Sequence, residues 1–281
     1  MTKEELARVL GFLALAAMVI AGGTIGVLHF VPPTSRLDPY RTTISQYSLT
    51  DLGWIFNAGV LLLSIASLLL VVALLSAGQA TPRSVGSIML TVWAVGLAAV
   101  VVFEKTDWTV GPSFSGQVHR VASFVAFIAM PIGALWVIGM ASRRWRQTPR
   151  RGLLLAGLFF TLGAVAYLCY LGLVLAVART SGTPWWQAIP LGFTERVLVV
   201  LEVAALLCLT ARIALGVGKS APEPVALQDD AVGRIGATGT TRSPHRACSR
   251  YPPTVPQDQP AGLSRTASPS AGRGAARSPV T

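Results

Sequence analysis

Six long apolar stretches dominate this sequence and limit the folds that the chain can adopt. A transmembrane helix needs about 20 mostly apolar residues, because each residue adds about 1.5 Å across a hydrocarbon core roughly 30 Å thick. Six segments meet this requirement, and they run approximately from Leu6 to Leu28, Phe56 to Ala77, Ser84 to Phe103, His119 to Ser142, Gly152 to Ala178 and Pro190 to Leu215. The sequence therefore predicts an all-α fold, a polytopic integral membrane bundle of six transmembrane helices.

The composition favours a lipid environment over a water-soluble fold. Only 12% of the residues are charged and 52% are hydrophobic, whereas soluble domains carry about 25% charged residues. The three cysteines, Cys169, Cys208 and Cys248, are too few and too scattered for a disulfide framework. These features exclude a secreted, disulfide-stapled fold and a cysteine-rich metal domain.

The two ends of the chain need separate interpretations. Glu4 and Glu5 precede the first apolar stretch, which is too long for the core of a signal peptide, so we expect a retained helix. From residue 219 onward, Pro, Ser, Ala, Gly and Arg predominate, and large apolar residues are too rare to offset the entropy of ordering. We therefore predict a transmembrane domain at 1–218 and a disordered, basic, cytoplasmic tail at 219–281. The net charge of +11 is spread over both parts, and we predict no nucleic-acid partner.

The positions of Arg and Lys predict the orientation in the membrane, because cytoplasmic loops retain these residues. The loop from Arg143 to Arg151 is strongly basic, and Lys3, Arg8 and Arg83 fall on the same side. Both termini are therefore expected in the cytoplasm, with six crossings of the plasma membrane. Within the first segment, the Gly22 and Gly26 pair would permit close packing against another helix.

Ionisable residues collect toward the opposite, outward-facing end of the predicted bundle. They flank the third, fourth and sixth apolar segments, and they are Glu104, Asp107, His119, Arg120, Glu195 and Arg196. Polar groups at membrane depth are costly unless they are paired or functional, so this polar corner is the candidate ligand-binding site. The alternative is that helix ends are where charge costs least, and that these acids and bases simply neutralise one another. The expected partners are Asp107 or Glu104 for Arg196, and His119 or Arg120 for Glu195.

Glu202 is the more discriminating member of the candidate site. It lies seven positions after Glu195, and is therefore on nearly the same helical face, roughly 10 Å deeper in the membrane. A carboxylate near the middle of the membrane costs about 2.5 to 3.5 kcal/mol. We therefore expect Glu202 to point inward, and to be protonated or paired with a donor on a neighbouring helix.

The common catalytic and cofactor motifs are missing from the sequence. It has no Gly-x-Ser-x-Gly, no Walker loop, no His-Glu-x-x-His and no Cys-x-x-Cys. A haem between helices would need facing ligands, and only His29 and His119 are available, both near the outer surface. We therefore predict no cofactor and no metal site.

Several short motifs, in order along the chain, resemble one known family. They are Thr43-Ile-Ser-Gln-Tyr-Ser48, Gly53-Trp-Ile-Phe-Asn57, Phe103 to Asp107, His119, and Gly192-Phe-Thr-Glu-Arg196. The chain resembles, from about Leu6 to Gly218, the bacterial and archaeal membrane proteins grouped as domain of unknown function 998. The resemblance implies a six-helix membrane bundle and supplies no reaction. It agrees that Asp107, His119, Glu195 and Arg196 belong to the polar corner.

Three functions remain open from the sequence, besides a structural or regulatory protein that acts on a partner through the basic loop and the tail. The leading hypothesis is a multi-pass membrane protein whose outer-leaflet polar cavity binds a small polar molecule or a lipid headgroup. The second is a proton-coupled transporter that uses Glu202. The third is a membrane enzyme acting on a lipid-linked substrate with His119 as base, although the sequence specifies no nucleophile.

Overall fold

The computed structural model describes residues 1–107, 109–142 and 150–216, and it shows an all-α multi-pass membrane protein. Six helices are long and apolar enough to cross a membrane: α1 (Lys3–Val27), α2 (Gly53–Ser76), α3 (Val85–Val102), α4 (Phe114–Ser142), α5 (Arg151–Thr180) and α7 (Leu191–Gly216). The short helix α6 (Trp185–Ala188) and two 3-10 helices, η1 (Thr34–Arg36) and η2 (Ile44–Leu49), lie in the connections. The six predicted spans are confirmed, with ends that differ by a few residues. The predicted tail at 219–281 and most of the basic loop from Arg143 to Arg151 lie outside the described residues.

Local sequence explains where two of these elements begin. Thr2 Oγ1 accepts a hydrogen bond from Glu5 N at 3.2 Å, and Glu5 Oε2 accepts one from Thr2 N at 2.8 Å. This reciprocal capping box satisfies amide groups that α1 leaves unpaired, and it gives a role to Glu5, one of the two acidic residues ahead of the first apolar stretch. Gln46 likewise reaches back to the amide of Thr43 at 3.0 Å, which fixes the start of η2.

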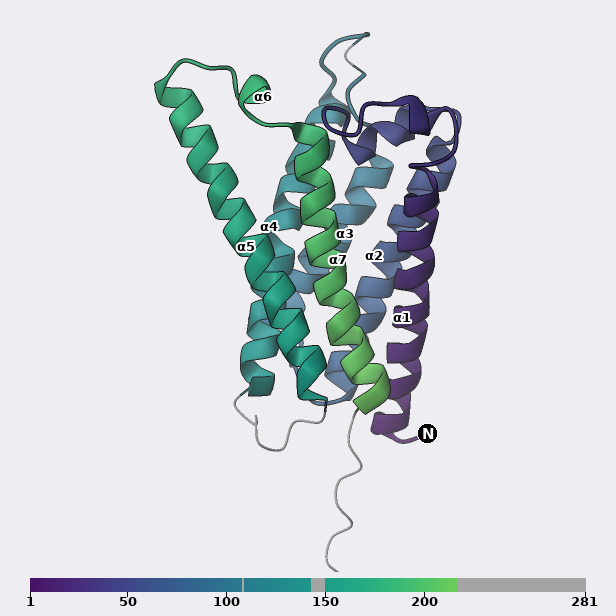
Figure 1. The fold of residues 1–281 in the computed structure, drawn as a ribbon. Helices are drawn as coiled ribbons and strands as arrows, with labels where there is room; N and C mark the ends of the chain where they lie inside the picture. The colour runs from purple at the N-terminus through teal and green to yellow at the C-terminus, as the bar shows by residue number, and fades with distance from the viewer. Residues whose placement is uncertain (108, 143–149, 217–281) are drawn as a thin grey trace, which may run out of the picture. The chain divides into compact units, whose positions relative to one another are not determined.

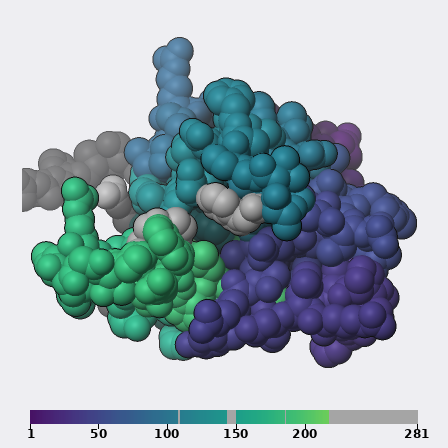
Figure 2. All heavy atoms as spheres, turned by 90° about the horizontal axis from the view of Figure 1, so that it is seen from above, coloured from purple at the N-terminus to yellow at the C-terminus, as the bar shows by residue number. Residues whose placement is uncertain are grey.

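The membrane-length helices alternate in direction, and each packs on its neighbours (Figure 1). Contacts join α1 to α2, α2 to α3, α3 to α4, α4 to α5, α5 to α7 and α7 back to α1, while α7 also contacts α2 and α4. The N-terminus and the end of α7 therefore lie at one end of the bundle. The connections at 28–52, 103–113 and 181–190 lie at the other, here called the loop end. Figure 2 views the loop end, where purple atoms of the first connection adjoin teal and green atoms from later segments.

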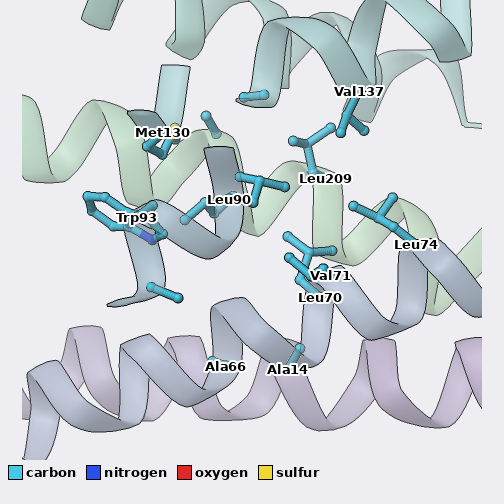
Figure 3. Packing of buried hydrophobic residues seen from close by; sticks show 14 of the residues in the cluster. Ala14, Ala66, Leu70, Val71, Leu74, Leu90, Trp93, Met130, Val137 and Leu209 are labelled. Carbon is cyan, nitrogen blue, oxygen red and sulfur yellow. The ribbon is translucent and has the colours of Figure 1, made fainter. Parts of the chain in front are cut away.

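The core combines a few large side chains with small residues that let helices approach (Figure 3). Trp93 of α3 is 1% exposed and donates from Nε1 to Ser67 Oγ of α2 at 3.1 Å. Gly133 of α4 packs on Leu90, where an added Cβ would lie 3.0 Å from the Leu90 Cγ. By contrast, an added Cβ at Gly22 or Gly26 would meet nothing within 4 Å. The close packing expected at that pair therefore occurs at other glycines.

Candidate functional site

Arg196, near the start of α7, fastens the first connection to the bundle. Its guanidinium Nε donates to His29 Nε2 at 3.1 Å, and its Nη2 donates to the Tyr47 hydroxyl at 3.0 Å. Its Nη1 donates to three carbonyl oxygens, those of Pro39 at 2.8 Å, Thr42 at 2.8 Å and Gly192 at 2.9 Å. The expected pairing of Arg196 with Asp107 or Glu104 is therefore wrong. Backbone carbonyls and two aromatic side chains of the first connection take the place of a carboxylate.

Three of the predicted site residues lie on the surface of the loop end. The side chains of Glu104, Asp107 and Arg120 are all exposed. Asp107 Oδ1 accepts hydrogen bonds from Thr109 N at 2.9 Å and Thr109 Oγ1 at 2.7 Å. These bonds hold the pKa of Asp107 below its usual value, because they stabilise the ionised form. Asp107 therefore orders its own turn, and the structure does not bring it together with Arg196.

A cluster that the sequence did not predict lies between the first connection, the α3–α4 connection and α7. The Lys105 ammonium donates to the hydroxyls of Thr43 and Ser45, with 2.8 Å between Lys105 Nζ and Ser45 Oγ. Glu195 Oε2 accepts a longer bond of 3.4 Å from Ser45 N. Burial lowers the pKa of Lys105, and the negative charge of Glu195 opposes part of this shift. We call Thr43, Ser45, Lys105 and Glu195 the Lys105 cluster.

The expected partner of Glu195 was His119 or Arg120, whereas its carboxylate accepts from the Ser45 amide. Lys105 is not among the residues that the sequence predicts for the site. Ser45 and Lys105 are 60 positions apart, and no motif spacing connects them. Their proximity depends on how the 3-10 helix η2 folds back over the bundle.

His119 is buried next to this cluster, at the first turns of α4. It is 4% exposed, and its Nδ1 lies 2.9 Å from the Phe103 carbonyl oxygen. Because a carbonyl only accepts, Nδ1 must carry the proton. The Nε2 atom is buried and has no hydrogen-bond partner among the described residues. His29 differs, since its Nε2 accepts from Arg196 and is not free to bind a ligand.

A narrow cavity of about 60 Å³ lies beneath the Lys105 cluster. Ser45 and Glu195 line it together with Ser123 of α4, and the rest of the lining is apolar. The apolar part includes three aromatic rings, those of Phe56, Trp93 and Phe127. The site thus combines a polar rim at the loop end with an apolar interior between helices.

Glu202 lies deeper on the same face of α7. Glu195 and Val199 both line the cavity, and Glu202 follows Glu195 by seven residues, which returns it to nearly the same direction. Its side chain is 0% exposed, so the predicted inward orientation is confirmed. Neither carboxyl oxygen has a hydrogen-bond partner among the described residues. The structure thus provides no donor from a neighbouring helix within that part of the chain.

Arg212, near the end of α7, is a buried cation that is not among the residues predicted from the sequence. It is 7% exposed and donates from Nη1 to Gln79 Oε1 at 2.7 Å. The contact ties α7 to the α2–α3 connection.

The sequence matches one known family. Residues 14–212 match the family model described as "Protein of unknown function (DUF998)". Comparisons with curated proteins and with solved structures return no match. The matched range contains every residue that lines the cavity and every residue of the Lys105 cluster. Because it covers well over half of the chain, this protein belongs to the DUF998 family.

Proposed function

We propose that this protein binds a small molecule with a polar end and a short apolar part, at the outer face of the plasma membrane. The observation that carries the proposal is the Lys105 cluster above an apolar cavity. Ligand sites in proteins are mostly apolar concavities with a few placed polar groups. The half-buried ammonium of Lys105 and the carboxylate of Glu195 give this site the polar groups.

The size of the cavity favours a small ligand over a whole lipid headgroup. A volume of about 60 Å³ exceeds the roughly 10–15 Å³ that one water needs on the same measure, yet it lies far below the roughly 300–1,000 Å³ of drug-sized pockets. The ligand contributes a charged or hydrogen-bonding group to Lys105 and Glu195. Its apolar part lies between α2, α3 and α4.

Calorimetric titration of the full chain in detergent tests this proposal. The probes are propylammonium, propionate and propanol, which share three carbons and differ in charge. We expect at least one to bind, and Lys105→Met or Glu195→Gln to remove its binding. Glu104→Gln is the matched control, because Glu104 is an exposed carboxylate at the same end. Absence of binding by all three probes, or binding unchanged in both cluster variants, would overturn the proposal.

Glu202 supports a second function, proton-coupled transport. Ionisable residues inside membrane bundles often form proton relays, and this carboxyl lacks a partner among the described residues. Uptake of the probe that binds is measured in proteoliposomes with and without an imposed pH gradient. Transport predicts gradient-driven uptake that Glu202→Gln abolishes. Uptake indifferent to Glu202→Gln, or no uptake at all, contradicts it.

A further inference from the structure

Ser45 and Lys105 have the geometry of a nucleophile and its base. Ser45 Oγ lies 2.8 Å from Lys105 Nζ, within the range in which a base can take a hydroxyl proton. The Ser45 hydroxyl itself donates to Thr43 Oγ1 at 3.2 Å in this structure. Serine activated by lysine is a known alternative to the Ser-His-Asp triad. The chain thus supplies a nucleophile that its linear sequence does not indicate.

The surroundings of Lys105 suit it to act as a base. Removing an ammonium from water disfavours its charged form, and burial lowers the pKa of Lys105 accordingly. Glu195 opposes part of this shift. In its neutral form, the amine has a lone pair that can take the Ser45 proton. The pKa supports the assignment, which stands on the geometry of the two side chains.

A third residue orients the base. Lys105 Nζ also donates to Thr43 Oγ1, and Thr43 caps η2 through its capping box with Gln46. The cap fixes the backbone of residues 43–46, and so it fixes Ser45 relative to Lys105. Nucleophile, base and orienting group are the three parts that activated-serine sites share.

The cavity offers space for an acyl group beside the nucleophile. Ser45 is 6% exposed and lines the cavity together with Ile44, Val60 and Glu195. The lining near Ser45 is mainly apolar and the volume is about 60 Å³. The site therefore fits a short aliphatic acyl chain, with the leaving group toward the loop end.

We propose that Ser45 and Lys105 catalyse acyl transfer from esters or amides of short aliphatic acids. Ser45 Oγ forms a bond to the carbonyl carbon, its proton passes to Lys105 Nζ, and the bond to the alcohol or amine leaving group breaks. The leaving group takes the proton from Lys105. Water then attacks the acyl carbon, gives its proton through Lys105 to Ser45 Oγ, and releases the carboxylic acid. This activity rests on the binding site proposed above.

Covalent labelling of the full chain in detergent tests the dyad. Diisopropyl fluorophosphate reacts with activated serines by replacing fluoride with the serine oxygen. Peptide mass spectrometry after labelling is expected to find the adduct on Ser45. Lys105→Met is expected to slow labelling at least about 100-fold, the low end of general-base contributions. Ser48→Ala is the matched control, because Ser48 lies in the same 3-10 helix as Ser45. The Ser48 hydroxyl donates to the backbone carbonyl oxygen of Ser45.

Two results would overturn the dyad. One is the absence of an adduct on Ser45 in the folded wild-type chain, and the other is an equal labelling rate in folded Lys105→Met. If that variant fails to fold, the labelling rate of Ser45 in the wild-type chain is measured against pH to test whether Lys105 acts as the base. Labelling that rises with pH supports the base, and labelling independent of pH overturns it. Probe binding that persists without labelling would reject the dyad and leave the proposed binding function intact.

Discussion

The Nε of Arg196 lies 3.1 Å from Nε2 of His29, and this contact joins the start of α7 to the end of α1 across 167 positions. Arg196 also binds carbonyl oxygens at Pro39 and Thr42. Its loss leaves these acceptors without their donor and frees the first connection. We expect Arg196→Met to lower the free energy of unfolding by about 3 kcal/mol. Thermal unfolding in detergent measures this change.

Hydrogen exchange of the same variant locates the effect. Faster exchange is expected in residues 37–47, where Arg196 holds the backbone, and little change is expected in α5. Arg120→Met serves as the control, because Arg120 is exposed at the same end. Equal stability of the two variants would refute the anchoring role of Arg196.

Lys105 makes stability depend on alkaline pH. Burial lowers its pKa in the folded chain below the ordinary value near 10.5, and Glu195 opposes part of the shift. Between the folded pKa and 10.5, the unfolded chain binds more protons, so the free energy of unfolding rises with pH in that window. Comparing the unfolding midpoints of wild type and Lys105→Met over that window isolates this contribution. An equal slope in both proteins would argue against a buried ammonium.

Glu202 is expected to lower the free energy of unfolding of the protein. A buried carboxyl without a partner loses its hydration and gains no hydrogen bond. Glu202→Leu is therefore expected to raise the free energy of unfolding by about 1–2 kcal/mol, and to abolish any gradient-driven uptake. Thermal unfolding in detergent provides the first reading. Lower stability in Glu202→Leu would mean that the carboxyl has a stabilising partner.

Gly192 allows α7 to approach the first connection. A Cβ added there would collide with the Thr42 carbonyl oxygen and lie 2.6 Å from that of Pro39. Gly192→Ala is expected to destabilise the protein by about 1–3 kcal/mol, as overpacking does. Gly172→Ala is the matched control on α5, because a Cβ there meets nothing within 4 Å. Similar unfolding temperatures for both variants would contradict this close approach.

Hydropathy was sufficient to predict the six membrane helices, because their length and composition are set by the bilayer. The inward direction of Glu202 was also predictable, since it follows from helical phase relative to Glu195. Most partners of Arg196 were not predictable, because they are backbone carbonyls. Every residue has a backbone carbonyl, so the sequence does not indicate which ones bind Arg196. The contact between Ser45 and Lys105 was not predictable either. Each residue lies in a connection between membrane helices, and hydrophobic periodicity does not indicate how such connections fold.

The exposed positions of Glu104, Asp107 and Arg120 show a related limit. A charged residue near the end of a predicted helix can be assigned a depth in the membrane. The sequence does not show on which side of the bundle its side chain lies. The sequence therefore predicted one end of the bundle for the polar corner, and the structure shows that three of its residues are exposed there. Glu195 lines the cavity, His119 is buried near Lys105 and Glu195, and Arg196 holds the first connection through carbonyls of Pro39 and Thr42.

Native mass spectrometry tests whether the Lys105 cluster and the cavity beneath it hold a small ligand. The full chain is purified in detergent as wild type, Lys105→Met, Glu195→Gln and Glu104→Gln. A bound small molecule is expected on the wild type and on Glu104→Gln, and its loss is expected from the two cluster variants. The same added mass on all four proteins, or on none of them, would contradict it.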